Sequence, residues 1–333
     1  TNMISKRPIR GRCIKNIDTW KSPIDHDGFT PLDLLTWKLS NTNFSNSKSN
    51  SSIEETSCFD SLVLSFGKAD FQLGIPLPKQ LSDIQKPRCL EDLPSNITKL
   101  SCNRHHTLAL TEDGAIFSWG HGFGGKLGHG DEHTQPLPKL IDATVLNERK
   151  VKVTAIAAGE DHSLALTADG RVFAWGSDRH GQLGLGSRSA STFTTSSDTI
   201  PPSSLSSSVD SSIHVTSPLP VSGLRKTRVR GIAAGARHSM CFSETAVYTW
   251  GSNSLGQLGL SQRSAERTIC VPRMVSLPVS TIVSVAAGPQ SSLVLLHREE
   301  DASDRREVYQ WGQGIQLPMR VPFSSRRRNS ISE

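Results

Sequence analysis

The residues of this chain that could do chemistry lie mostly between positions 120 and 134, in GHGFGGKLGHGDEHT. Gly120 to Lys126 fits G-x-x-x-x-G-K, a loop whose backbone N–H groups surround phosphates while the lysine balances their charge. That loop needs Ser or Thr next, to hold magnesium, and Leu127 stands there. The chain then continues through glycine and two prolines, where a phosphate loop would open a helix. We therefore expect no nucleotide here.

Four further side chains of this stretch are metal ligands by type, namely His121, His129, Asp131 and His133. Three imidazoles and a carboxylate suit zinc or a similar ion. No helix fixes their spacing, however, and histidines in a polar turn are usually solvated. We favour a structural turn, with no metal and no cofactor, over the metal alternative.

The structural interpretation is favoured because the stretch recurs. Segments 115–128, 171–184 and 246–259 align, with weaker copies at 62–74 and 307–318. Lys126 shares its position with Gln182 and Gln257, which argues against a catalytic lysine. The repeated aromatic, glycine and leucine positions are Trp119, Gly120, Leu127, Trp175, Gly176, Leu183, Trp250, Gly251 and Leu258.

A second repeated block precedes each Trp-Gly pair. It reads AIAAGEDHSLALTADG at 155–170 and GIAAGARHSMCFSETA at 231–246, with weaker copies at 100–114 and 285–300. His106, His162 and His238 occupy one position in this block. A general base needs one poised site, so we expect each histidine to hold its repeat through a buried hydrogen bond.

Both blocks have the composition of strands joined by tight turns, because small and apolar residues alternate between Gly and Asp-Gly signals. Asp113-Gly114 and Asp169-Gly170 predict hairpin turns. A short antiparallel sheet cannot cover both of its faces, so the repeats must pack on one another. Radial stacking gives a β-propeller, with a tryptophan filling the space between neighbouring blades. We predict an all-β fold.

The motifs A-A-G-x-x-H-S, D-G-x-V-x-x-W-G and G-Q-L-G together resemble the repeat of the regulator of chromosome condensation family. That family forms a seven-bladed propeller, and the resemblance covers residues 58–321. Four full copies and one partial copy imply an incomplete ring, which lacks about two of the seven blades. Near residue 300, EEDASDRRE replaces Asp-Gly and predicts a longer hairpin.

The N-terminal stretch DHDGFTPLDLLTW (25–37) is similar to the start of an ankyrin repeat, with Asp33 in place of the usual histidine. An ankyrin segment followed by these propeller repeats resembles the inhibitor of Bruton's tyrosine kinase family. That resemblance implies tandem BTB domains after the propeller, inhibition of a kinase, and a substrate-adaptor role for a cullin-3 ubiquitin ligase. Because no BTB sequence is present, we expect the chain to be a fragment.

The expected domain organisation has four parts. A partial ankyrin-like helical repeat at 1–39 and a Ser/Asn-rich linker at 40–57 precede the propeller repeats at 58–323, and a basic tail occupies 324–333. A Ser-rich insertion at 187–217 is too poor in apolar residues to order itself. In the tail, Ser330 follows three arginines and is a candidate substrate for a basophilic kinase.

We expect a non-enzymatic protein-interaction scaffold in the cytoplasm, with the nucleus as a second location, that binds a kinase or a ubiquitin-ligase substrate. The alternative is a guanine-nucleotide exchange factor or a chromatin-associated regulator of a small GTPase, since the propeller family's founding member acts on Ran.

Other partner classes are not expected. The net charge of +6 is mild, and the basic runs at 224–230 and 324–330 contain no aromatics that could stack on bases, so we do not expect nucleic acid. No run approaches the ~18 apolar residues of a membrane span. The 6 cysteines have neither metal nor disulfide spacing.

Overall fold

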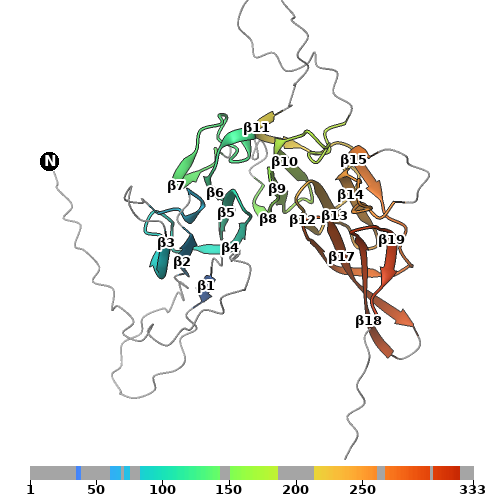
Figure 1. Cartoon of the computed structure of the whole chain (residues 1–333). Coiled ribbons are helices and arrows are strands. Elements are labelled where there is room, and N and C mark those ends of the chain that lie inside the picture. The colour runs from blue at the N-terminus through green and yellow to red at the C-terminus, as the bar shows by residue number, and fades with distance from the viewer. Residues whose placement is uncertain are drawn as a thin grey trace, which may run out of the picture. The chain divides into compact units, whose positions relative to one another are not determined.

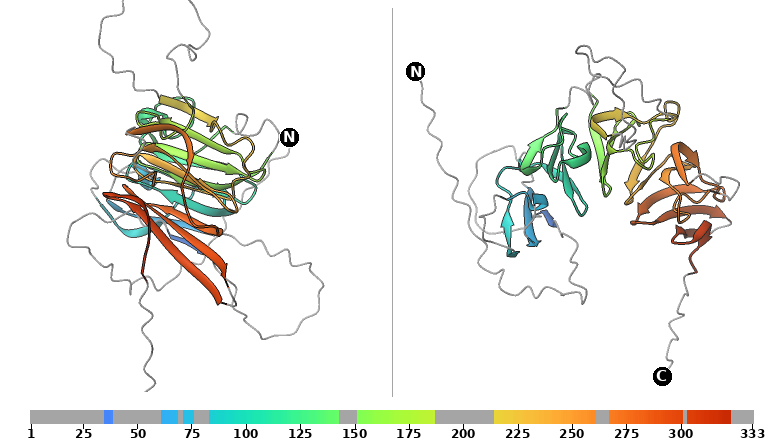
Figure 2. Two further views of the ribbon diagram at one scale, coloured as in Figure 1. Left: turned by 90° about the vertical axis from the view of Figure 1, so that its right-hand side faces the viewer. Right: turned by 45° about the horizontal axis from the view of Figure 1, so that its top comes forward.

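The computed structural model of this chain describes residues 35–38, 61–68, 71–75, 83–142, 151–186, 214–260, 267–300 and 303–322. All of them belong to one compact unit. The described residues form five antiparallel sheets, which Figures 1 and 2 show following one another in chain order. The expected all-β fold with propeller-type blades is confirmed.

We number the sheets 1 to 5 in chain order. Sheet 1 has β1 (Leu35–Lys38), β2 (Ser61–Lys68) and β3 (Asp83–Cys89). Sheet 2 has β4 (Ile97–Cys102), β5 (His106–Thr111), β6 (Ile116–Gly120) and β7 (Gln135–Leu140). Sheet 3 has β8 (Val153–Ala158), β9 (His162–Thr167), β10 (Val172–Ser177) and β11 (His214–Pro220).

Sheet 4 has β12 (Gly231–Ala234), β13 (His238–Phe242), β14 (Val247–Ser252) and β15 (Thr268–Met274). Sheet 5 has β16 (Thr281–Ala287), β17 (Ser291–Glu300), β18 (Ser303–Gly312) and β19 (Ile315–Arg320). Two short 3₁₀ turns, η1 (Phe71–Leu73) and η2 (Phe123–Gly125), complete the described elements.

The Asp-Gly pairs turn the chain between the second and third strands of sheets 2 and 3. Gly114 and Gly170 have φ values of 93° and 86°, which only glycine adopts readily. Their N–H groups donate to the carbonyls of Thr111 and Thr167, at 3.1 and 2.9 Å. The predicted hairpins are therefore present.

The strands of sheets 2 to 5 lie in chain order from one edge to the other. In such an antiparallel sheet, the first and third connections lie at one end and the second at the other. We call the end that carries the first and third connections the loop face. The first connections of sheets 2 to 5 are residues 103–105, 159–161, 235–237 and 288–290. The opposite end, the turn face, carries 112–115, 168–171, 243–246 and the segment 221–230.

The hydrophobic core lies between successive sheets, because the second strand of each sheet contacts the first strand of the next. One cluster joins sheets 2, 3 and 4, a second joins sheets 1 and 2, and a third joins sheets 4 and 5. Trp119, Trp175 and Trp250 have an exposed fraction of 0%. Each fills the space between its own sheet and the preceding one, together with apolar residues of both.

Two strand boundaries differ from the sequence expectation. Leu35–Lys38, placed in an ankyrin-like helix, form strand β1, which pairs with β2. Pairing with β2 outweighs the weak helical preference of four residues, since it satisfies the backbone groups of β1 that face β2. Strand β11 begins at His214, so residues 214–217 belong to sheet 3 and not to the insertion.

The copy at 307–318, which the sequence marks as partial, forms a full four-stranded sheet, whereas the copy at 62–74 has three described strands. The longer hairpin is confirmed, because β17 and β18 pair as far as Glu300 and Ser303 and project beyond their neighbours (Figure 2). The linker at 40–57, residues 1–34 of the ankyrin-like segment, and Ser330 lie outside the described residues.

Candidate functional site

Sheets 2 and 3 are joined by a hydrogen-bonded set of four groups, which we call the His–Ser–Trp motif. His106 at the start of β5 places Nε2 2.8 Å from Oγ of Ser163 on β9. The Ser163 hydroxyl donates to the carbonyl of Lys126, at 2.8 Å. The indole N–H of Trp175 donates to that same carbonyl, at 2.9 Å. We call residues 125–128, and their counterparts in the other repeats, the Gly-x-Leu-Gly arm. One backbone oxygen of the arm of sheet 2 therefore accepts hydrogen bonds from two side chains of sheet 3.

The same motif repeats at the next two junctions. His162 and His238 lie 2.9 Å from Ser239 and Ser292. The Ser239 hydroxyl and the Trp250 indole N–H donate to the carbonyl of Gln182, at 2.7 and 2.8 Å. The Ser292 hydroxyl and the Trp311 indole N–H donate to the carbonyl of Gln257, at 2.8 and 2.9 Å. The repeated histidines, tryptophans and arms are thus the residues that attach each sheet to the next.

This arrangement fixes the tautomer of the three histidines. Each serine uses its own proton for the carbonyl, so it must accept from the histidine Nε2–H. The Nδ1 atoms have no hydrogen-bond partner in the described part of the chain. Burial lowers the pKa of His106 and His162 to about 3 and that of His238 to about 4. Neutral, inaccessible imidazoles of this kind hold structure and do not serve as general bases at neutral pH.

The glycine of A-A-G is required by the close approach of the histidine ring. A Cβ on Gly235 would lie 2.2 Å from Cε1 of His238 and 2.7 Å from the carbonyl oxygen of Gly288 in the next sheet. Sheet 2 has Asn103 at this position, and its Nδ2 reaches the carbonyl of Ala158 in sheet 3, at 3.3 Å. The first connections of successive sheets therefore lie directly against one another.

Lys126, the lysine of the phosphate-like stretch, is 3% exposed. Its ammonium pairs with the Asp161 carboxylate of sheet 3. Burial opposes ionisation of Asp161, but the hydrogen bond and charge of Lys126 outweigh it and lower the pKa of that carboxyl. Lys126 therefore joins sheet 2 to sheet 3, whereas the sequence suggests only a residue in a turn.

The candidate metal ligands of the same stretch point to different partners. His129 Nε2 lies 2.9 Å from Ser118 Oγ, and the backbone N–H of His133 donates to Asp131 at 2.9 Å. The ring of His121 packs edge-on against Phe71, with centroids 5.2 Å apart. No group of three or more metal-ligating side chains converges within the described ranges.

The residues between the A-A-G glycine and the histidine differ from sheet to sheet, although their surroundings are constant. They are Arg104-His105, Glu160-Asp161, Ala236-Arg237 and Pro289-Gln290. All four pairs lie in the first connections, on the loop face. Rigid, repeated flanks that present variable loop residues are typical of a binding surface.

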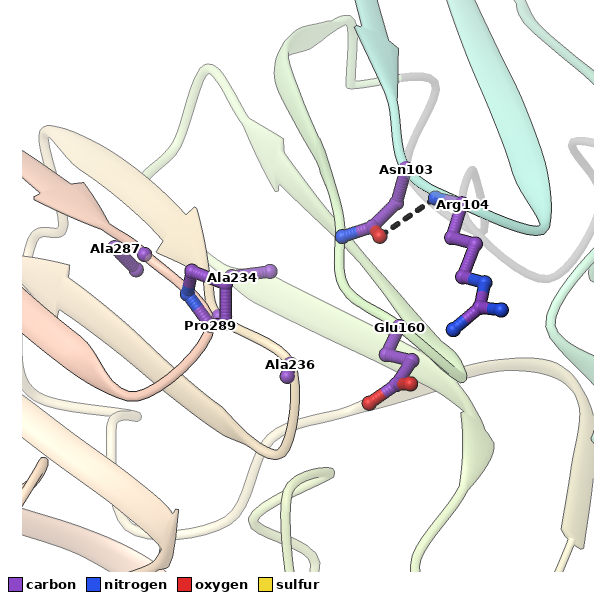
Figure 3. A pocket seen from close by; sticks show the side chains of 9 residues that line it. Asn103, Arg104, Glu160, Ala234, Ala236, Ala287 and Pro289 are labelled. Atoms are coloured by element: carbon purple, nitrogen blue, oxygen red, sulfur yellow. Dashed lines mark hydrogen bonds between the residues drawn. The ribbon is translucent and has the colours of Figure 1, made fainter. Parts of the chain in front are cut away.

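A groove of about 330 Å³ lies among these connections (Figure 3). Its lining comes from four sheets and comprises Asn103, Arg104, Glu160, Ala234, Gly235, Ala236, Ala287, Gly288 and Pro289. Sequence reasoning missed this groove. The only signal for it is the variable pair within an otherwise constant motif.

Antiparallel sheets attached one to the next by a buried tryptophan and histidine define a propeller-type repeat protein. The chain belongs to the RCC1-like domain family, whose model matches residues 56–320. The family expectation is thus confirmed, whereas nothing in the comparisons supports ankyrin repeats or the inhibitor of Bruton's tyrosine kinase.

Known proteins with similar sequences include two ubiquitin ligases. Human "E3 ubiquitin-protein ligase HERC2" is 32% identical over 240 residues, which are 70% of this chain and 4% of that protein. Human "Probable E3 ubiquitin-protein ligase HERC6" is 33% identical over 63% of this chain and 18% of its own length. This chain therefore spans only a small part of either relative.

Solved structures share the fold at lower sequence identity. Human WBSCR16 has a TM-score of 0.59 at 22% identity, covering 79% of this chain and 65% of that one. Prp20p from Saccharomyces cerevisiae has a TM-score of 0.58 at 21% identity, covering 80% and 60%. Within the part of the chain that the structure describes, no helix is long and apolar enough to cross a membrane.

Proposed function

We propose that this chain is a protein-interaction module without catalytic activity of its own, and that partners dock on its loop face. The observation that carries the proposal is the variable pair of residues in each first connection. The histidines, glycines and tryptophans beside these pairs are fully used in joining sheets. The pairs themselves vary, and the first residue of each pair, namely Arg104, Glu160, Ala236 or Pro289, lines the groove.

A small GTPase is the partner class that the family and the structural neighbours support best, with this chain, in the alternative to a non-catalytic module, as its exchange factor or chromatin-associated regulator. The chain belongs to the RCC1-like domain family, and its structural neighbour Prp20p has binding properties to Gsp1p and histones. Kinase inhibition and a cullin-3 adaptor role, expected from the finer resemblance, gain no support. The ligase names of the HERC relatives describe proteins of which this chain covers a small part.

The docking surface can be tested with two charge-matched triple variants. The first replaces three exposed loop-face arginines, Arg104, Arg179 and Arg237, by glutamate. The control replaces Arg225, Lys226 and Arg228 on the turn face, which are also exposed. Proteins that co-purify with the unaltered chain are quantified by mass spectrometry. We expect the loop-face variant alone to lose them; equal losses from both variants would contradict the proposal.

The GTPase partner class has a separate test. Release of a fluorescent guanine nucleotide is followed for a panel of small GTPases, with binding measured in parallel. Binding that the loop-face variant abolishes supports this class. Faster release would show an exchange activity and would contradict the proposal that the chain is not catalytic. If no GTPase in the panel binds, this partner class is wrong while the docking surface stands on the first test.

A further inference from the structure

The groove on the loop face has one charged end and one apolar end (Figure 3). Arg104 and Glu160, with the neutral amide of Asn103 beside them, form the charged end. The opposite end consists of alanine, glycine and proline from sheets 4 and 5, and these residues are Ala234, Gly235, Ala236, Ala287, Gly288 and Pro289. No long side chain fills this second end, so a ligand side chain of modest size can lie there.

The groove is held open by hydrogen bonds between the connections that line it. The N–H of Glu160 donates to the carbonyl of Ala236, at 3.3 Å, and the N–H of Ala236 donates to the carbonyl of Pro289, at 3.2 Å. Asn103 Nδ2 adds a bond from sheet 2 to the Ala158 carbonyl. These bonds pre-organise the lining, which lowers the entropic cost of binding.

The charges at the groove mouth are unequally compensated. Glu160 Oε2 lies 3.9 Å from Nε of Arg237, and the neighbouring Asp161 is paired with Lys126. The side chain of Arg104 is exposed and forms no ion pair with any residue of the described ranges. Arg104, Arg237 and Glu160 therefore carry a net charge of +1 together, and of the two arginines Arg104 is the one without an ion-pair partner among the described residues.

We propose that this groove binds a carboxylate-bearing segment of a partner protein. An Asp or Glu side chain of that segment pairs with the Arg104 guanidinium, whose forked donors match a carboxylate. A small aliphatic side chain nearby in the segment then lies on Ala234, Ala236 and Pro289. This inference rests on the proposed function, because it assumes that the loop face docks proteins, and it adds the chemistry that the partner must present.

The test uses short fluorescein-labelled peptides in which one glutamate lies one to four residues from one valine. Matched peptides carry glutamine or lysine in place of the glutamate. Binding to the full chain is measured by fluorescence anisotropy. We expect at least one glutamate spacing to bind about two- to fivefold more tightly than its glutamine counterpart, which is the gain of a solvent-exposed ion pair. High salt should weaken that preference, since the pair is solvent-exposed.

Arg104→Glu should abolish the preference for glutamate and give a preference for the lysine peptide. Arg225→Glu changes the net charge equally but lies on the turn face, so it should leave the preference intact. Ala236→Trp should fill the apolar end and weaken every peptide, with the melting temperature as the check on folding. A preference for glutamate that survives in Arg104→Glu would overturn the inference, and so would a preference for lysine in the unaltered chain, which would assign the site to Glu160.

The outcome separates this inference from the proposed function. Peptides without charge selectivity, together with protein partners that the loop-face triple variant loses, would remove the carboxylate site and keep the docking role. Selective peptides without any protein partner on that face would keep the groove as a site and remove the docking role.

Discussion

The buried histidines predict that the folded chain loses stability as the pH falls below neutrality. Their pKa values in the folded state are about 3 for His106 and His162 and about 4 for His238. In an unfolded chain a histidine has a pKa of about 6.5. Because the folded values are depressed, the unfolded state takes up protons first. The stabilisation is fully present above about pH 6.5 and is lost progressively as the pH falls toward about 3.

The size of the effect follows from linkage. At about pH 5.5, protonation stabilises each unfolded histidine by about 1.4 kcal/mol, while the buried histidine takes up almost no proton. The three His–Ser–Trp motifs therefore lose about 4 kcal/mol between about pH 8 and pH 5.5, which is a large share of a typical unfolding free energy. Partly buried histidines such as His105 and His129, whose pKa values burial also lowers, act in the same direction.

The assay is urea denaturation at the two pH values for the unaltered chain and for His162→Gln. The glutamine amide can still donate to Ser239, but it does not titrate. We expect the variant to be less stable at pH 8, with a pH-dependent loss that is smaller by about 1.4 kcal/mol. An identical pH-dependent loss in both proteins would refute the assignment of His162 as a buried neutral donor.

Three further predictions concern the junctions and the tail. Trp175→Ala should lower the unfolding free energy by roughly 3–5 kcal/mol, because it removes a fully buried aromatic and its hydrogen bond to Lys126, and thermal denaturation checks this. Lys126→Gln should cost only about 1 kcal/mol in urea, since Asp161 is half exposed and glutamine occupies this position in the sister arms, whereas Lys126→Ala should cost more. Ser330 should be phosphorylated by a basophilic kinase, and mass spectrometry that finds phosphate only within residues 187–213 would contradict this.

The repeated elements of the fold could be predicted because their signals are local. A Trp-Gly pair, an Asp-Gly turn and an alternating apolar run lie within one repeat, so the sequence predicts each sheet and the burial of its tryptophan. The helical expectation for residues 35–37 was wrong for the opposite reason. Strand β1 depends on pairing with β2, and a short local pattern contains no information about that partner.

The candidate site could not be predicted because it combines residues from separate repeats. The groove takes its lining from the first connections of four sheets, and the Lys126–Asp161 pair joins two of them. Such contacts depend on how one sheet packs on the next, which the sequence of a single repeat does not specify. Aligning the repeats does mark the variable pairs, but it does not show that the first residues of these pairs line one groove.

Site-specific photo-crosslinking in cells would decide whether partners dock on the loop face. A benzophenone amino acid is introduced in turn at position 104, at position 123, where the loop-face Phe123 is 70% exposed, and at position 225 on the turn face. We expect crosslinked partner proteins from positions 104 or 123 and none above background from position 225. Crosslinks from position 225 alone, or equal yields from all three positions, would contradict docking on the loop face.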